Sequence, residues 1–401
     1  MGPVPAHHLL PVRSEHLQPG MYVAELDRSW LHAPFPSTGF LITGSEQVEQ
    51  LRRLCHHVYI DTRLSETLPA GRSGLGRMAP RTTAQSATGG RLGAVRQVLS
   101  QTVAAVAALV QGARRQGIVD ASAVTACASR LVARLVEDAA LLHFCLRTEQ
   151  GGGFLCRRAA GTAVVATTLA WRLGLDRQGL EGVATGALLL DLGKIAVPVP
   201  ILAKPGALAS SEQAYVRRHV ERGLGLVAGA GLPERALEMM ATHHERIDGS
   251  GYPHRYRGTT IPLFGRLAAI ADAYDAMTLN RRYAAAMSPH AALRQLEGLA
   301  GEKYDAALVD ELVQALGVYP CGTLVELDDG RVGLAWTPRP GHPLQPEVLV
   351  THDARRQPLP LPVLVSAAGA TGIFRSLPPS ALIIGTDVLA AALERERPAA
   401  G

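Results

Sequence analysis

The sequence predicts a mostly α-helical protein with a small α+β domain at its N-terminus and a short β-rich appendage at its C-terminus. Between about Arg91 and Gly317, apolar residues recur at three- and four-residue spacing, which is the period of an amphipathic helix. On both sides of this region, short apolar runs alternate with turn residues, and this pattern indicates strands. We therefore expect an N-terminal accessory domain, a flexible linker, a helical domain and an appendage over residues 1–65, 66–92, 93–320 and 321–401.

The N-terminal domain is predicted from short strand-like runs around one helix. The helix is expected over Ser45–Cys55, with Ser45 as its N-cap, because three apolar residues share one face (Val48, Leu51 and Leu54). The strand-like runs cover residues 21–23, 39–44 and 58–61. The next segment, residues 66–92, has no aromatic residue and is rich in Gly, Ser, Thr, Ala and Arg. It has too little apolar surface to offset the entropy of ordering, so we expect a flexible linker.

The boundary between the helical domain and the appendage is marked by a change in the spacing of the apolar residues. Leu308, Leu312 and Leu316 repeat the helical spacing, and Gly317 is well placed to end that last helix. Beyond it, a hairpin is predicted around the turn Asp328-Asp329-Gly330. Its strands and a further strand are expected over Thr323–Leu327, Val332–Trp336 and Val348–Thr351. The closing stretch, Ala381–Arg397, has a less distinct pattern that is compatible with a helix.

The composition is that of a globular protein. The 401 residues are 47% hydrophobic, which is enough for a sizeable core. The net charge of +5 is spread along the chain, so we expect no nucleic-acid polymer as a partner. Five cysteines without Cys-x-x-Cys pairs disfavour a disulfide framework, and we expect a cytoplasmic protein. The apolar stretch Val103–Val110 is far shorter than the roughly 20 residues that span a bilayer, so we expect no membrane association.

The most informative motif is His-His-Glu-Arg-Ile-Asp-Gly-Ser-Gly-Tyr-Pro, residues 243–253. Two adjacent imidazoles and two carboxylates beside a glycine turn are typical of a metal site, although neighbouring polar residues can also lie on a solvated helix end. Further metal-ligating residue types stand at separate places in the chain, namely Asp191 with Lys194, His219, and Asp272 with Asp275.

Taken in this order, these residues resemble the HD-GYP family of cyclic-di-nucleotide phosphodiesterases. The resemblance implies an all-helical, HD-domain-like core. The segment Leu17–Val23, followed by Leu26-Asp27, Trp30 and Pro34-Phe35, is similar to the accessory domain of unknown function that often precedes HD-GYP domains. The resemblance also implies five metal ligands at Asp191, His219, His243, His244 and Asp272.

The chain departs from the family pattern at three ligand positions. Arg158 and Leu190 stand where two further histidines are expected, and Phe154 stands where some members have a glutamate. The remaining residues resemble the complete set of one metal position, Asp191, His219, His243 and His244. We therefore predict at most one divalent metal ion, with iron or manganese favoured, or none. Leu190 is expected in the core. Arg158 could pair with Asp191 or Asp272, or turn outward.

The resemblance also suggests how a substrate is handled. It places Asp191 and Lys194 in the catalytic site, and Lys194 could instead be a solvated lysine near a helix end. Arg281 matches a phosphate-binding arginine, but Ala284 replaces a second basic residue. Gly251, Tyr252 and Pro253 could contact a ligand or form only a rigid turn.

Roles can also be predicted for three other acidic residues near these motifs. We expect Glu245 and Asp248 to accept hydrogen bonds from the paired histidines. Asp275 is expected to be structural.

Two functions from different classes fit these residues best. The first is a cyclic-di-GMP signalling protein with a degenerate metal site and little or no phosphodiesterase activity, which acts by binding a cyclic di-nucleotide or a protein such as a diguanylate cyclase domain. The alternative is an active metal-dependent phosphodiesterase that uses the surviving mononuclear site. Hydrolysis of a different phosphate ester by that site is a third interpretation.

Overall fold

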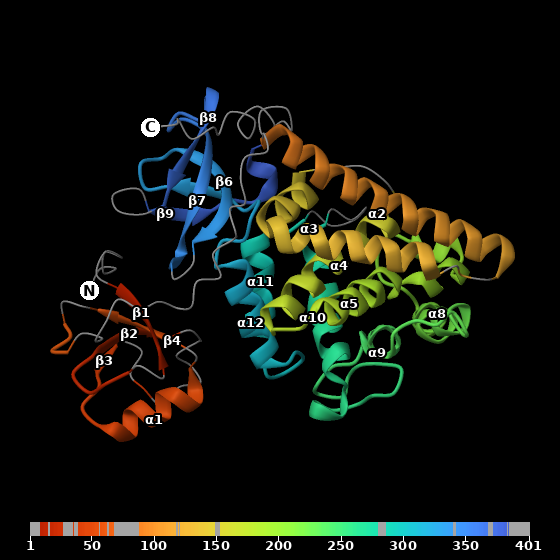
Figure 1. Cartoon of the computed structure of the whole chain (residues 1–401), viewed down its shortest axis with the longest axis horizontal. Helices are drawn as coiled ribbons and strands as arrows, with labels where there is room; N and C mark the ends of the chain where they lie inside the picture. Colours follow the sequence, from red (N-terminus) through yellow and green to blue (C-terminus); the bar gives the residue numbers. More distant parts are fainter. Residues whose placement is uncertain are drawn as a thin grey trace.

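The computed structural model shows an N-terminal α+β domain, a large helical domain and a C-terminal sheet (Figure 1). The residues that it describes are 9–14, 17–26, 35, 39–55, 57–61, 64–67, 88–117, 119, 121–148, 153–279, 286–339, 342–367, 372–382 and 384. The predicted linker is therefore mostly outside the described residues, and helix α2 begins at Thr88. The mostly helical fold with a small α+β domain and a β-rich appendage is confirmed.

The N-terminal domain is a four-stranded antiparallel sheet that packs against one helix. The sheet order is β1-β4-β2-β3, and helix α1 spans Ser45–Leu54. Val48 and Leu51 of α1 join a separate small core with Val23, Ile42 and other residues. Gly44, not Ser45, is the N-cap, and no side chain caps the helix, so that prediction was wrong. The strands span Leu9–Arg13 (β1), Tyr22–Leu26 (β2), Phe40–Leu41 (β3) and His57–Asp61 (β4).

Two long helices and a set of shorter ones make up the helical domain. Its α-helices span Thr88–Gln116 (α2), Ala121–Thr148 (α3), Phe154–Arg172 (α4), Arg177–Leu189 (α5), Val199–Leu202 (α6), Ser210–Arg217 (α7), His219–Leu226 (α8), Glu234–Thr242 (α9), Leu263–Thr278 (α10), Pro289–Gly298 (α11) and Ala306–Leu316 (α12). Two 3-10 turns, η4 (Leu192–Ala196) and η5 (Gly258–Thr260), lie among them. Gly317 follows α12 at a φ of 77°, so its predicted role in ending the last helix is confirmed.

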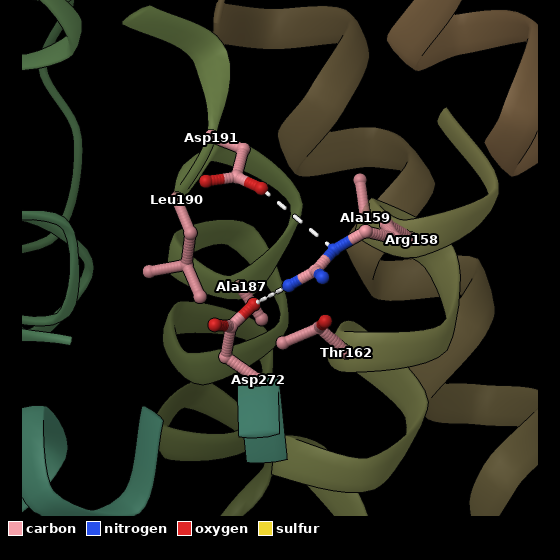
Figure 2. Close-up of a pocket in the computed structure, with 7 residues that line it drawn as sticks. All are labelled: Arg158, Ala159, Thr162, Ala187, Leu190, Asp191 and Asp272. Carbon is pink, nitrogen blue, oxygen red and sulfur yellow. Dashed lines mark hydrogen bonds and ion pairs between the residues drawn. The ribbon is translucent and has the colours of Figure 1, made fainter. Parts of the chain in front are cut away.

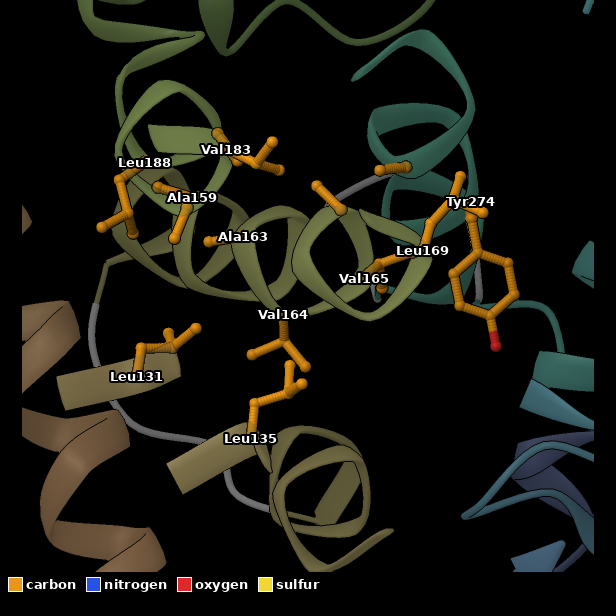
Figure 3. Packing of buried hydrophobic residues seen from close by; sticks show 14 of the residues in the cluster. Leu131, Leu135, Ala159, Ala163, Val164, Val165, Leu169, Val183, Leu188 and Tyr274 are labelled. Carbon is orange, nitrogen blue, oxygen red and sulfur yellow. The ribbon is translucent and has the colours of Figure 1, made fainter. Parts of the chain in front are cut away.

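Helix α4 lies at the centre of this domain because its residues are small and apolar on nearly every side. From Ala159 to Ala170 every residue is buried. Such a helix has no polar face for water, so it must be surrounded by other elements. It packs against α2, α3, α5, α10 and α12, and Val164 points toward Leu135 of α3 (Figure 3). This arrangement places Arg158, near the start of α4, beside Asp191, which follows α5, and Asp272 of α10, where the candidate site is found.

The C-terminal appendage is a five-stranded antiparallel sheet in the order β8-β7-β6-β5-β9. The predicted hairpin corresponds to β5 and β6, joined around Gly330. The sheet packs on the helical domain: Phe144 of α3 meets Trp336 of β6 edge-on, with ring centroids 4.6 Å apart. The strands span Leu324–Leu327 (β5), Val332–Arg339 (β6), His342–His352 (β7), Pro358–Ser366 (β8) and Ile373–Ser376 (β9). Most of the predicted closing helix lies outside the described residues.

One helix of the described chain is long and apolar enough to cross a bilayer by length and composition alone, the stretch Gly90–Arg115 of α2. A third of its apolar window, 33%, is buried inside the protein. Val95, Leu99 and Val106 of this stretch belong to the same core as α3 and α4. Core helices of water-exposed domains pass the same length test, so this stretch is weak grounds for a membrane span.

Candidate metal centre

Four of the five predicted ligands come together where three short elements meet. Asp191 directly precedes η4, His219 is the first residue of α8, and His243 and His244 follow α9. Gly193 makes this meeting tight, because a Cβ atom there would lie 1.9 Å from the carbonyl oxygen of His219. Only glycine lets η4 approach α8 this closely, and the approach brings Asp191 beside His219.

The donor atoms of these four residues converge on one point. One ligand atom from each of Asp191, His219, His243 and His244 lies within 4.8 Å of the others. His219 Nε2 is 3.5 Å from Asp191 Oδ1 and 3.4 Å from His243 Nε2. Asp191, His219 and His243 are buried, so water does not solvate these donors freely.

The hydrogen bonds of the two buried histidines show that neither Nε2 atom carries a proton, so that the lone pairs of the two Nε2 atoms face each other. His219 Nδ1 donates to the carbonyl oxygen of Val216 at 2.8 Å, and His243 Nδ1 donates to that of Met240 at 3.0 Å. A carbonyl can only accept, so both neutral rings carry their proton on Nδ1. Two lone pairs cannot form a hydrogen bond with each other, and His244 Nε2 is also buried with no hydrogen-bond partner in the described part of the chain. A cation between them would satisfy all three, so these residues fit a divalent metal ion.

The protonation states suit metal binding as well. Burial lowers the pKa of His219 to about 4 and lowers the pKa values of His243 and His244. All three imidazoles are therefore neutral near pH 7, which is the form that coordinates metal. Burial alone would raise the pKa of Asp191, but Lys194, Arg158 and the neighbouring histidines hold it well below its usual range. The site offers three neutral nitrogens and one carboxylate.

Asp272, the fifth predicted ligand, is engaged by Arg158 instead of joining this group. Arg158 donates from a terminal guanidinium nitrogen to Asp272 Oδ1, and its Nε lies 3.8 Å from Asp191 Oδ2 (Figure 2). Of the two alternatives for Arg158, the structure shows the inward one. Leu190 packs beside the pair and is 3% exposed, as expected for a core residue. Phe154 lies at the start of α4 and is 52% exposed.

The guanidinium leaves almost no free space at this second position. The pocket between Arg158, Leu190, Asp191 and Asp272 holds about 10 Å³, roughly the room for one water molecule. Burial alone would lower the pKa of Arg158, but Asp272 and Asp191 raise it, so the side chain remains a cation. A permanent positive charge therefore lies between two carboxylates that a metal ion could otherwise bridge.

Lys194 also points into the centre. Its Nζ lies 2.7 Å from Asp191 Oδ1, close enough for an ion pair but not aligned for a hydrogen bond. It is not a freely solvated lysine, because its side chain is 21% exposed. Arg281 and Ala284 lie outside the described residues.

The Gly-Tyr-Pro turn packs directly on the histidine cluster. The Tyr252 ring stacks on the His244 ring with centroids 4.6 Å apart, and the Arg217 guanidinium lies 4.9 Å from the centre of the Tyr252 ring. Gly251 is required for this contact, because a Cβ atom there would lie 2.5 Å from the backbone of Glu245 and Arg246. Pro253 follows Tyr252 in the same turn.

Sequence reasoning was wrong about the two acidic residues of this motif. The Glu245 carboxylate accepts from the backbone N–H groups of His254 and Tyr256, at 2.7 and 3.1 Å. Asp248 accepts from the backbone of Ser250. Backbone carbonyls, not these carboxylates, orient His219 and His243, because the helix ends place Val216 and Met240 within reach of each ring.

Asp275 is the other acidic residue whose environment the sequence left open. It is 1% exposed, and among the described residues neither of its carboxylate oxygens has a hydrogen-bond partner. Burial raises its pKa to about 6. It packs against α4 at Gly161, where a Cβ atom would lie 2.1 Å from its Oδ1. A structural role was predicted for it, but nothing in the sequence indicated a buried carboxylate without a hydrogen-bond partner.

Comparison with known proteins identifies the helical part of the chain. A family model described as HD domain matches residues 139–308, and a model for a domain of unknown function, DUF3391, matches residues 10–124. The helical part of this chain is therefore similar to HD domain proteins. Its predicted resemblance to HD-GYP proteins that carry an N-terminal accessory domain is confirmed. Proteins of the family depend on metal ions, and the Asp191 and histidine cluster could hold one.

Three proteins to which this chain is similar are named as phosphodiesterases. The cyclic di-GMP phosphodiesterase PA4108 of Pseudomonas aeruginosa is 29% identical over 89% of this chain and 88% of its own length. The cyclic di-GMP phosphodiesterase response regulator RpfG of Xanthomonas campestris is 38% identical over 37% of this chain. The 3'3'-cGAMP-specific phosphodiesterase 2 of Vibrio cholerae is 36% identical over 38% of this chain. The last two matches span only 40% and 30% of those proteins. The chain is therefore similar over most of its length to a cyclic di-GMP phosphodiesterase.

Proposed function

We propose that this protein is a cyclic-di-nucleotide signalling protein that binds at most one divalent metal ion and has little or no phosphodiesterase activity. The observation that supports this proposal is the place of the Arg158 guanidinium, bonded to Asp272 and 3.8 Å from Asp191. Iron or manganese is the favoured ion at the surviving position, since three imidazoles and a carboxylate suit both.

The low activity follows from what a guanidinium can and cannot supply. A bound divalent ion polarises a phosphoryl oxygen and lowers the pKa of bound water, so that hydroxide is available near pH 7. Arg158 can balance negative charge, but it has no acceptor atom and does not lose its proton in proteins. It therefore neutralises Asp191 and Asp272 without generating a nucleophile. Loss of one of two metal positions removes part of the clamp on the attacking and leaving oxygens.

The alternative function is an active phosphodiesterase with a mononuclear centre. The complete donor set of Asp191, His219, His243 and His244 favours it, because all four atoms converge within 4.8 Å. Lys194 favours it too, since a cation 2.7 Å from Asp191 could reach a substrate phosphate beside the metal.

The proposed mode of action is binding. Cyclic di-GMP is the natural first ligand to test, because PA4108 and RpfG are named as phosphodiesterases of that nucleotide. A diguanylate cyclase domain is a candidate protein partner, and a cytoplasmic location fits the five buried cysteines, which form no disulfide in the described part of the chain.

One experiment separates the two functions. Metal content and cyclic di-GMP turnover are measured anaerobically for the wild type, His243→Ala, and the double variant Arg158→His with Leu190→His. We expect close to one metal ion and little or no turnover in the wild type, and a second ion with a gain of turnover in the double variant. Wild-type turnover that disappears in His243→Ala would instead establish the active mononuclear enzyme.

A further inference from the structure

The loop of residues 254–257 is exposed, yet its backbone is held from inside the protein. All four residues, His254, Arg255, Tyr256 and Arg257, are exposed. Glu245 is 1% exposed, and its two carboxylate oxygens accept from the N–H groups of His254 and Tyr256. The buried carboxylate therefore fastens the loop on both sides of Arg255.

This fastening imposes an unusual backbone conformation on Arg255. Its φ is +59°, in the left-handed region that a residue with a Cβ atom rarely adopts. N–H groups on both sides of a left-handed residue turn toward the same point, and an anion fits there. Glu245 is that anion. A left-handed residue that is not glycine is held only where its surroundings determine it, and such residues cluster at functional sites.

The fastened loop presents a particular combination of groups to solvent. The His254 and Tyr256 rings are stacked, with centroids 4.9 Å apart and an angle of 21° between their planes. Arg255 lies between the two ring residues in the sequence and Arg257 follows Tyr256, and in the part of the chain that the structure describes neither guanidinium forms an ion pair with an acidic side chain. Flat rings suit a nucleobase, and unpaired guanidinium groups suit a phosphate.

The loop is directly connected to the metal cluster. Glu245 follows the candidate ligand His244 in sequence, and Tyr252, two residues before the loop, stacks on the His244 ring. The base of the loop is fixed as well, because Gly258 N donates to the Ile247 carbonyl oxygen at 2.9 Å. The residues that hold the loop are therefore the neighbours of the histidine cluster.

We propose that residues 254–257 form a nucleotide contact, in which Tyr256 stacks on a base and Arg255 binds a phosphate of a cyclic di-nucleotide. The inference rests on the proposed function and names a site on the protein for its ligand. Glu245 acts as a positioning residue, because it holds the left-handed backbone from which Arg255 projects.

The test uses the full chain, cyclic di-GMP as the probe, and titration calorimetry. Arg255→Gly keeps the left-handed backbone, since glycine adopts it freely, and removes only the guanidinium. We expect its Kd to rise about tenfold, the loss expected for one charge-assisted hydrogen bond, with a weaker dependence of Kd on salt and unchanged metal content. Tyr256→Ala should also weaken binding, whereas Tyr256→Phe should retain it.

The matched control is Arg356→Gly, because Arg356 has a φ of +63° in the C-terminal sheet domain. It should bind cyclic di-GMP as the wild type does. The inference is overturned if Arg255→Gly binds like the wild type, if both glycine variants lose the same affinity, or if the wild type does not bind cyclic di-GMP. The metal and turnover measurements judge the proposed metal stoichiometry and low activity independently of these results.

Discussion

The two halves of the candidate site balance the negative charge of their carboxylates in different ways. In one half, Asp191 and three histidines converge with lone pairs that face one another, an arrangement that requires a cation from outside. In the other half, Asp272 already has its cation, because Arg158 of the central helix α4 supplies it. Two regions that share Asp191 can therefore differ completely in their need for metal, and the nature of a single neighbouring residue decides which behaviour is found.

Removal of a donor from the histidine half should have the largest effect. We expect His243→Ala to lower the bound metal from close to one equivalent to near zero, measured by elemental analysis, because one of three neutral nitrogens is lost. His290→Ala is the matched control, since His290 also bonds a backbone carbonyl through Nδ1 but lies outside the cluster. Equal metal content in the two variants would contradict the assignment of the cluster.

Removal of the cation from the arginine half should reduce stability instead. In Arg158→Met, Asp272 keeps a buried charge without its partner, and we expect a loss of about 3–5 kcal/mol in the free energy of unfolding. Urea unfolding in the presence of a chelator measures it. Arg172→Met is the control, because Arg172 of the same helix forms an ion pair with Glu311 in which its side chain is 47% exposed, and its loss should be at most about 1 kcal/mol.

If the two arginine variants lose similar amounts of stability, Arg158 does not act as a buried counterion. Adding Asp272→Leu to Arg158→Met should recover part of the stability, because the uncompensated charge is then removed.

The contact between the Gly-Tyr-Pro turn and the histidine half can be weakened without changing any donor. In Gly251→Ala the new methyl group would lie 2.5 Å from backbone atoms that cannot move aside, and we expect a loss of about 1–3 kcal/mol with weaker metal binding. Thermal unfolding and metal titration measure these. Gly225→Ala in helix α8 is the control, since nothing lies near its added Cβ and it should be neutral or stabilising. Normal metal affinity in Gly251→Ala would separate the turn from the cluster.

The smallest effect concerns Asp275, which lies one turn after Asp272 on α10 and forms no ion pair with any described residue. Burial raises its folded-state pKa to about 6 from an ordinary value of 3.8. Its favourable contribution is therefore fully present below pH 3.8 and is lost as pH rises to 6, because the folded state must then ionise it. Relative to the wild type, Asp275→Asn should gain about 2 kcal/mol between pH 4 and 6 and stay nearly level above that. A pH-independent difference in urea unfolding would contradict this.

The sequence predicted most of the fold because its signals are local. The spacing of Leu308, Leu312 and Leu316 and the position of Gly317 define a helix and its end without any tertiary information. The donor set could be predicted because the residues of the histidine motif are adjacent and resemble a known family pattern. Glu245 could not be placed by sequence, since its partners are backbone N–H groups nine and eleven residues away. The side of α4 on which Arg158 lies is likewise set by packing that no local pattern records.

The Arg158 guanidinium makes one half of the site insensitive to changes in metal supply and oxidation in a cell. A metal ion exchanges with its surroundings, can be taken by a chelator and can change oxidation state. A guanidinium is attached to the chain, is present once in every molecule and is not redox-active. The charge balance at Asp272 is therefore independent of metal supply and of oxygen, and only the histidine half can report on either.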